Sequence, residues 1–270
     1  MPAVEELVTR ARGGDAAALD ELVRAVSDDV YALAIRMLWH PHDAEDATQE
    51  ILVRVVTRLS TFRGESSFRT WVFRVAANHL LTTRRRRAEL PELTFDAFGT
   101  DLADGLDTPH DAKLDERLLE QEVKIGCTQG MLLCLDREHR LAYILGEVFE
   151  LSGEQAADVL EIAPAAYRKR LSRARERIQS FMRGHCGLVD PANPCRCSRR
   201  VGRAIAIGRI DPERLLFATH AVRRGVEEMD ALHDAAAVFR SHPSYAAPDA
   251  VAERVAELLR SPRYSTLTDT

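Results

Sequence analysis

The stretch that decides the fold of this chain is LSGEQAADVLEIAPAAYRKRLSRARERI, residues 151–178. Ser152 is placed to cap a short helix, because serine side chains accept hydrogen bonds from the first free N–H groups of a helix. That helix carries small or apolar residues on one face: Ala156, Ala157 and Leu160. Pro164 suits the first turn of a second helix, where its missing N–H costs little. The stretch therefore predicts two helices joined by a tight turn.

The second helix has an apolar face and a basic face. The residues expected to be buried are Tyr167, Leu171, Ala174 and Ile178, and those expected to be exposed are Arg168, Lys169, Arg173 and Arg177. A short helix, a turn and a basic helix form the helix-turn-helix layout, which places the start of the second helix at base edges in a major groove. The arginines would supply phosphate affinity but little sequence information. The alternative is a basic helix with a merely solvated face.

Composition places this pattern in an all-α protein. The 270 residues suggest two or three domains, and short alternations typical of strands are nearly absent. No apolar run approaches the roughly 18 residues that span a bilayer, and the first residues lack a secretory signal. We therefore expect a cytoplasmic protein that does not enter the membrane. Five cysteines are an odd number that does not fit a disulfide framework.

Charge is distributed in blocks, although the net charge is only −5. One basic block is Arg84–Arg87, and a second lies within residues 168–177. Every charged residue between Glu89 and Asp111 is acidic. Two basic patches joined by an acidic strap are thus the feature that a function has to explain.

Apolar spacing and breaks divide the chain into four segments. We expect a helical domain at residues 1–87, an acidic flexible linker at 88–112, a helix-turn-helix domain at 113–183 and a Cys-containing helical extension at 184–270. In the first segment an apolar stripe predicts one helix: Val30, Leu33, Ala34, Met37 and Leu38. His40–His42 should break that helix, and Asp43 should cap the next one. In the extension we expect helices near 211–222, 224–239 and 248–260.

The quoted stretch resembles the promoter-reading domain of the sigma-70 family, in its small extracytoplasmic-function branch. The ending RLSRARERI, residues 170–178, is especially similar. Independently, DAEDATQEILVRVVTRLSTFRGESSFRTWVFRVAANHLLTTRRRR, residues 43–87, resembles the N-terminal domain of the same family. Both matches occur in the family's order and are joined by the acidic linker. Residues 187–270 lie outside the resemblance.

The resemblance implies a role for the helix that begins DAEDATQE. In the family this helix binds a coiled coil of the large subunit of RNA polymerase. The residues expected to face that partner are Asp43, Asp46, Gln49 and Glu50. Carboxylates on an exposed helical face suit a basic partner, but the same residues are also compatible with a simple solvated face.

The resemblance also implies two sets of DNA contacts. The segment from Phe62 to Arg87 is similar to the part that melts the promoter and holds the unpaired strand, a task that suits rings and cations. Its expected contacts are Phe68, Arg74, Asn78, Arg84, Arg85, Arg86 and Arg87, while Trp71 is expected in the core. On the second helix of the helix-turn-helix they are Ala165, Ala166, Tyr167, Arg168, Lys169, Arg170, Arg173 and Arg175. The family often has smaller residues at positions 167 and 169, so the DNA sequence read is expected to be unusual.

The linker and the extension leave alternatives open. The acidic linker resembles the family's connector, which threads through positively charged channels of polymerase, but it is equally compatible with a disordered tether. Cys186, Cys195 and Cys197 cluster with His185 in HCGLVDPANPCRC. Their spacing is poor for a structural zinc site, so reduced, unliganded cysteines are favoured over a metal site or a redox pair. Cys127 and Cys134 are expected in the core.

The leading interpretation is a sigma factor that binds core RNA polymerase and directs promoter recognition and opening. Its expected partners are core polymerase, the double-stranded upstream promoter element, the unpaired strand at the melted region and an anti-sigma regulator. The alternative is a stand-alone helix-turn-helix regulator that never binds core polymerase. A cysteine- or metal-dependent enzyme would need catalytic groups that the sequence does not show, so we expect neither catalysis nor a cofactor.

Overall fold

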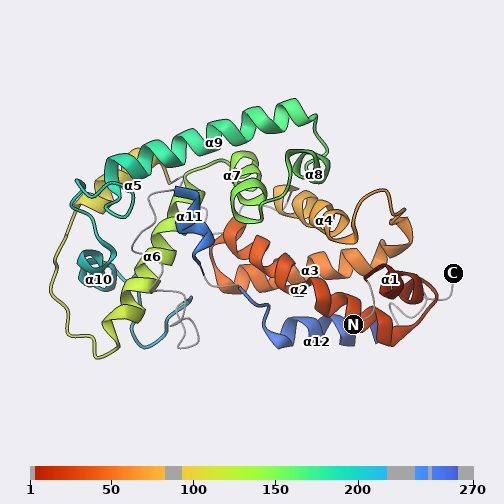
Figure 1. Cartoon of the computed structure of the whole chain (residues 1–270). Coiled ribbons are helices and arrows are strands. Elements are labelled where there is room, and N and C mark those ends of the chain that lie inside the picture. The colour runs from red at the N-terminus through yellow and green to blue at the C-terminus, as the bar shows by residue number, and fades with distance from the viewer. Residues whose placement is uncertain (1–3, 83–92, 218–234, 243–244, 261–270) are drawn as a thin grey trace. The chain divides into compact units, whose positions relative to one another are not determined.

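The computed structural model describes residues 4–82, 93–217, 235–242 and 245–260. Within these ranges every regular element is helical, which confirms the predicted all-α class (Figure 1). The chain forms two compact units. The first combines Met1–Ala88, Ser152–Tyr167 and Ser244–Thr270, and the second combines Glu89–Leu151 and Arg168–Pro243.

The first unit is built around a long helix. Its N-terminal part consists of α1 (Val4–Arg12), α2 (Ala16–Leu38), α3 (Pro41–Thr57) and α4 (Phe68–Thr82), with a 3₁₀ turn at Leu59–Thr61. Helix α2 packs against α1, α3 and α4. Its predicted apolar stripe is confirmed, since Val30, Leu33, Ala34, Met37 and Leu38 are all buried. Each such valine or leucine contributes about 1.5–3 kcal/mol through burial.

The junction between α2 and α3 differs in detail from the prediction. Trp39 ends α2 with a φ of 70°, a left-handed conformation that turns the chain out of the helix. Helix α3 then begins at Pro41, with His40 as its N-cap. Asp43 therefore lies in the first turn of α3. The sequence had predicted it as the N-cap, and that prediction is wrong. Its carboxylate still favours the positive end of the helix.

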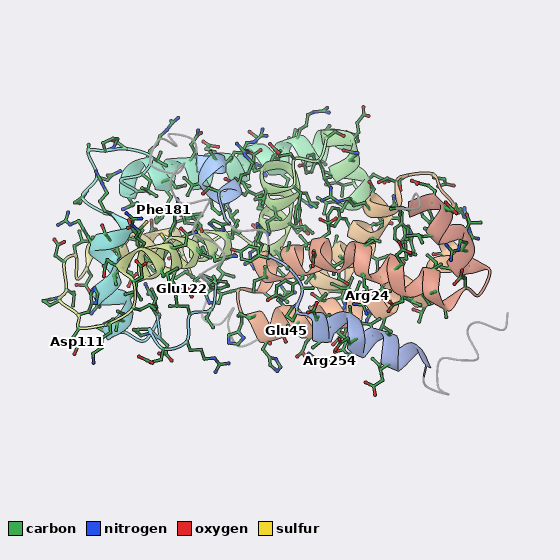
Figure 2. The ribbon with its side chains drawn as sticks, turned by 60° about the horizontal axis from the view of Figure 1, so that its bottom comes forward. Arg24, Glu45, Asp111, Glu122, Phe181 and Arg254 are labelled. Carbon is green, nitrogen blue, oxygen red and sulfur yellow. The ribbon has the colours of Figure 1, made fainter. Side chains whose placement is uncertain are left out.

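Two later segments complete the first unit. Helix α8 (Gly153–Val159) packs against α4, and α12 (Asp249–Arg260) packs against α2 and α3. Arg254 of α12 lies 3.8 Å from Glu45 of α3, and both are labelled in Figure 2. Val251 and Val255 bury the apolar face of α12. The predicted helix at 248–260 is thus confirmed.

The second unit contains the other helices of the described residues. They are α5 (Phe95–Ala103), α6 (Glu116–Leu133), α7 (Arg137–Tyr143), which continues into a π-helical turn at Ile144–Val148, most of α9 (Pro164–His185), α10 (Cys197–Ala206) and α11 (Ala235–Arg240). Helix α10 packs on α6. Their shared core is Leu119, Val123, Val201, Ala204 and Ile210.

The linker and the extension depart from the predicted outline. Residues 88–112, expected to be a flexible linker, contain α5, which Thr94 caps by accepting a hydrogen bond from Ala97 N. Helix α10 was not predicted, and the described part of the expected helix at 211–222 consists of turns. Of the expected helix at 224–239, the described part is helical from Ala235. The predicted four-segment division stays a prediction. None of the helices described has both the length and the apolar character needed to cross a bilayer.

Candidate polymerase and promoter interface

The predicted polymerase-binding residues share one side of α3. Asp43, Asp46 and Gln49 are partly exposed and Glu50 is exposed, while the opposite side packs into the core. One imidazole nitrogen of His42 and one carboxylate oxygen each of Asp43 and Asp46 lie within 4.8 Å of one another. This follows from the spacing of three and four residues on a helix. The result is an acidic surface on the side of α3 that faces away from the core.

Helix α4 divides its predicted DNA contacts between the core and the surface. Phe68 is 2% exposed and packs against Phe62 and Trp71, with ring centroids 5.4 and 5.6 Å away. Trp71 is buried, as predicted. The predicted DNA contact of Phe68 does not fit this burial, because a ring enclosed by other aromatics offers no face for a base. The Phe68 ring, counted as a DNA contact because rings can stack on unpaired bases, packs in the core instead.

The polar edge of α4 is paired with acidic groups at α8. The guanidinium of Arg74 lies 2.5 Å from the carboxylate of Asp158 and also donates to the Asp158 carbonyl at 3.2 Å. The side-chain amide of Asn78 donates to Glu161 at 2.9 Å. Both candidates for unpaired-strand contact thus have protein partners. The predicted block Arg84–Arg87 lies outside the described residues.

Local sequence builds the helix-turn-helix as predicted. Ser152 and Gln155 form a reciprocal capping box at the start of α8, in which each side chain bonds the other residue's backbone. Glu161 turns the chain at a φ of 53° after α8. Pro164 then begins α9. Ser152 and Pro164 therefore perform the roles that the sequence assigned to them.

Helix α9 has the two faces that its sequence predicts. Tyr167, Leu171, Ala174 and Ile178 are buried, and Arg168, Lys169, Arg173 and Arg177 are exposed. Ala165 and Ala166 are also exposed in its first turn. Tyr167 is 1% exposed, so its predicted DNA contact does not fit the structure. Its ring is instead a core element.

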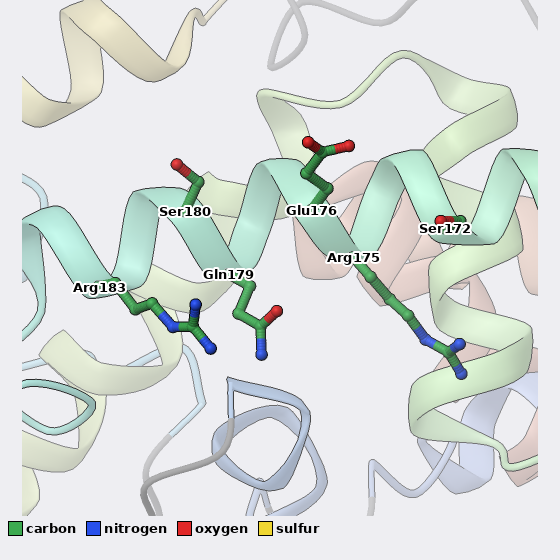
Figure 3. A pocket seen from close by; sticks show the side chains of 6 residues that line it. All are labelled: Ser172, Arg175, Glu176, Gln179, Ser180 and Arg183. Carbon is green, nitrogen blue, oxygen red and sulfur yellow. The ribbon is translucent and has the colours of Figure 1, made fainter.

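The basic residues of α9 fall into two classes. Arg170 lies 2.7 Å from Glu138, and Arg175 donates to Glu147 at 2.6 Å. Figure 3 shows Arg175, Gln179 and Arg183 projecting from one side of α9, with Glu176 and Ser180 on the other. By contrast, Arg168, Lys169 and Arg173 have no ion pair among the residues described, so their charges face solvent.

The acidic linker meets arginines of the extension within the second unit. Asp101 pairs with Arg200 at 3.2 Å and also with Arg209, and Asp104 pairs with Arg203. The side-chain hydrogen bond from Arg199 lowers the pKa of Asp107. The linker thus lies against helix α10 and the residues after it.

Several of these partners were missed by sequence reasoning. Asp158 and Glu161 lie more than 80 positions from the α4 residues that they bind, and the linker carboxylates lie more than 90 positions from their arginines. No local pattern signals such pairs, because single charges recur throughout a chain that is 29% charged. Only the folded arrangement identifies them.

Comparison with known proteins agrees with this geometry. Residues 22–89 match sigma-70 region 2, and residues 125–178 match sigma-70 region 4. The chain is similar to the ECF RNA polymerase sigma factor SigW of Bacillus subtilis, with 29% identity over 67% of this chain and 97% of that protein. It is also similar to the RNA polymerase sigma-H factor of Pseudomonas aeruginosa, with 30% identity over 66% of this chain and 93% of that protein.

Among solved structures, the co-crystal structure of the sigma factor RpoE with the anti-sigma factor NepR from Bartonella quintana is similar at a TM-score of 0.41. The match has 24% identity and covers 59% of this chain and 92% of that one. The sequence relatives are more informative, because the chain covers 93% of a protein to which it is 30% identical. Regions 2 and 4 also occur in the expected order. The chain therefore belongs to the sigma-70 family, as a sigma factor of the ECF type.

Proposed function

We propose that this chain binds core RNA polymerase in the cytoplasm and directs it to promoters, without chemistry of its own. The observation that carries the proposal is the exposed basic start of α9, directly after α8 and its turn. Arg168, Lys169 and Arg173 are exposed there without ion pairs among the described residues. Cations at the start of such a helix suit phosphates and base edges in a major groove.

The first turn of α9 is proposed to approach the bases. Ala165 and Ala166 are exposed and small, so they would let the helix axis come close to the groove floor. Arg170 and Arg175 are proposed to position α9 instead, because they bind Glu138 and Glu147. Their loss would therefore act through the helix and not through a direct contact.

The polar edge of α4 is proposed to hold the unpaired strand. Arg74 and Asn78 would exchange their carboxylate partners for phosphate and base groups of DNA, which offer the same acceptor chemistry. Arg84–Arg87 would add cations along the same strand. Phe68 and Tyr167 are not part of this proposal.

The acidic side of α3 is proposed to bind polymerase. Asp43, Asp46, Gln49 and Glu50 would complement a basic surface on the large subunit, and such charges govern association and orientation. An anti-sigma protein remains a proposed regulator.

Run-off transcription with core polymerase on promoter fragments tests the proposal. We expect the chain to direct specific start sites, and the double variant Arg168→Ala/Lys169→Ala to reduce those transcripts at least about tenfold, since each contact contributes about 1–3 kcal/mol. The matched control is Arg183→Ala, an exposed arginine in the last turn of the same helix, which should retain activity.

A second arm separates polymerase binding from DNA binding. The charge reversal Asp46→Arg/Glu50→Arg should abolish capture of core polymerase while leaving duplex DNA affinity unchanged. If the unaltered chain binds DNA but neither captures core polymerase nor supports initiation, a stand-alone regulator replaces the sigma factor as the function.

A further inference from the structure

Four of the five cysteines come together in the second unit, although they lie in separate parts of the sequence. Cys127 belongs to α6, Cys186 follows α9, Cys195 lies in the next loop and Cys197 begins α10. All four are partly buried free thiols. The fifth, Cys134, is the C-cap of α6, where its sulfur donates to the Gly130 carbonyl at 3.3 Å.

Backbone hydrogen bonds bring Cys186 and Cys195 side by side. Gly187 N donates to the Cys195 carbonyl at 3.0 Å, which closes the loop between them. Val189 N and Asp190 N donate to the Cys186 carbonyl at 3.2 and 2.9 Å. A side chain at Gly187 would overlap the Cys195 carbonyl, so only glycine permits this approach. The loop is therefore held in one conformation by polar contacts.

Packing brings Cys127 and Cys197 to the same place. Cys197 packs against the apolar core shared by α6 and α10, which includes Val123 and Val201. Cys127 follows Val123 by four residues, so it occupies the same face of α6 one turn further on. Figure 1 shows α10 beside α6.

Burial and mutual proximity both mark the thiols as one cluster. Burial raises the pKa of Cys127, and the neighbouring thiols of Cys197, Cys186 and Cys195 raise it further. The pKa of Cys197 is raised by burial and then by Cys186. The four thiols therefore interact with one another within the second unit.

Basic groups around the cluster act in the opposite direction. Arg200 favours the thiolate form of Cys127, Lys124 that of Cys197, and Arg196 and Arg199 that of Cys195. Glu120 is the acidic neighbour of Cys197. A centre of four thiolates and a divalent cation carries two net negative charges, which these cations would offset.

His185 does not join the cluster, although the sequence placed it there. Its ring packs on Phe181 at 4.7 Å between centroids and lies directly over Gly99. The candidate ligands are therefore sulfur alone. Four sulfur donors suit zinc and similar thiophilic ions in tetrahedral sites.

We propose that Cys127, Cys186, Cys195 and Cys197 bind a single thiophilic divalent cation, of the zinc class, as a structural centre that fastens the extension to α6. Each cysteine would release its S–H proton to solvent as its sulfur binds the ion, without oxidation. No three of these described sulfurs lie within 4.8 Å of one another, so ion binding must draw them together to metal–sulfur distances of about 2.3 Å.

Metal content of the purified full-length chain tests the proposal. We expect about one zinc ion per chain after exhaustive dialysis, as measured by inductively coupled plasma mass spectrometry. Each of the variants Cys127→Ser, Cys186→Ser, Cys195→Ser and Cys197→Ser should lose most of that zinc. The control Cys134→Ser should keep it, because Cys134 lies outside the cluster. Equal loss in all five variants would contradict the assignment of ligands.

Cobalt provides a measurement that needs no variant. After zinc is replaced by Co²⁺ in the unaltered chain, the thiolate-to-cobalt charge-transfer absorption should have the intensity expected for four bound thiolates. In a separate measurement, removal of the metal by a chelator should expose residues 186–217 to limited proteolysis until zinc is restored. Absence of bound metal, or a disulfide between Cys186 and Cys195 in the freshly purified chain, would overturn the proposal. These outcomes are independent of the transcription assay, so either proposal can fail alone.

Discussion

Arg140 shows how one buried cation can complete a helix end. It is 4% exposed, and its guanidinium donates to the carbonyls of Leu132 at 2.9 Å, Leu133 at 3.4 Å and Leu135 at 3.0 Å. The last carbonyls of a helix have no partners within it, so α6 depends on this side chain. The resulting contacts hold α7 against the end of α6.

Arg140→Ala should therefore destabilise the chain by about 2–4 kcal/mol, because it removes a buried guanidinium that donates to three backbone carbonyls. Urea denaturation followed by circular dichroism measures the change. The control Arg177→Ala removes an exposed arginine 3.8 Å from Asp136 and should cost less than about 0.5 kcal/mol. Equal effects of the two substitutions would contradict the role of Arg140.

The burial of Tyr31 makes the stability of the folded chain depend on pH in the alkaline range. Burial, aided by the charge of Glu45, raises the pKa of the Tyr31 phenol from 10.0 to about 12. In the unfolded chain the phenol ionises first, so the folded state loses stability as pH rises from about 10 towards about 12. Tyr31→Phe should flatten this loss. Midpoints of urea unfolding across that pH interval measure it, and parallel curves for both chains would refute the expectation.

At the scale of elements, α4 and α8 share polar partners that DNA could replace. Arg74 and Asn78 bind Asp158 and Glu161, and exposed pairs of this kind contribute only about 0.2–1 kcal/mol each. Such weak contacts are easily exchanged for contacts with a polyanion. Breaking these contacts therefore costs little free energy when the unpaired strand binds.

The double variant Asp158→Asn/Glu161→Gln should bind forked promoter DNA about two- to tenfold more tightly, because Arg74 and Asn78 lose their competing partners. Fluorescence anisotropy measures the affinity. The control Glu154→Gln/Glu176→Gln removes the same charge from exposed positions. The gain should also vanish when Arg74→Ala is added; a gain that persists there would show that overall charge, and not α4, is responsible.

Across the whole molecule, local patches outweigh the net charge of −5. The linker carboxylates Asp101 and Asp104 are paired with arginines of the extension, whereas the start of α9 keeps unpaired cations among the described residues. DNA binding should therefore depend on a few cations, each of which releases counterions.

Three single variants test this: Arg168→Ala, Lys169→Ala and Arg173→Ala. If the residue binds one phosphate, each variant should make the negative slope of log affinity for duplex DNA against log salt concentration shallower by about 0.9. Titrations at several salt concentrations give the slopes. Arg183→Ala should leave the slope unchanged. Unaltered slopes in the first three variants would place the DNA surface elsewhere.

By itself, the sequence determined the features that depend on neighbours along the chain. Periodicity and capping predicted the helical class, the start of α9 at Pro164 and the faces of that helix, because these arise within a few turns. It also carried the family resemblance that the comparisons confirm. It counted Phe68 and Tyr167 among the DNA contacts, although both rings are buried and the burial of Tyr167 was itself predicted, since a ring suits a core as well as a base.

Only the tertiary structure decided which distant groups meet. It paired Arg74 with Asp158, laid the acidic linker on arginines of the extension and brought Cys127 near Cys197. Such contacts join residues tens of positions apart, and they follow from how the apolar faces of helices pack. Charge and sulfur chemistry are visible in the sequence, but their partners are set by packing that no local pattern records.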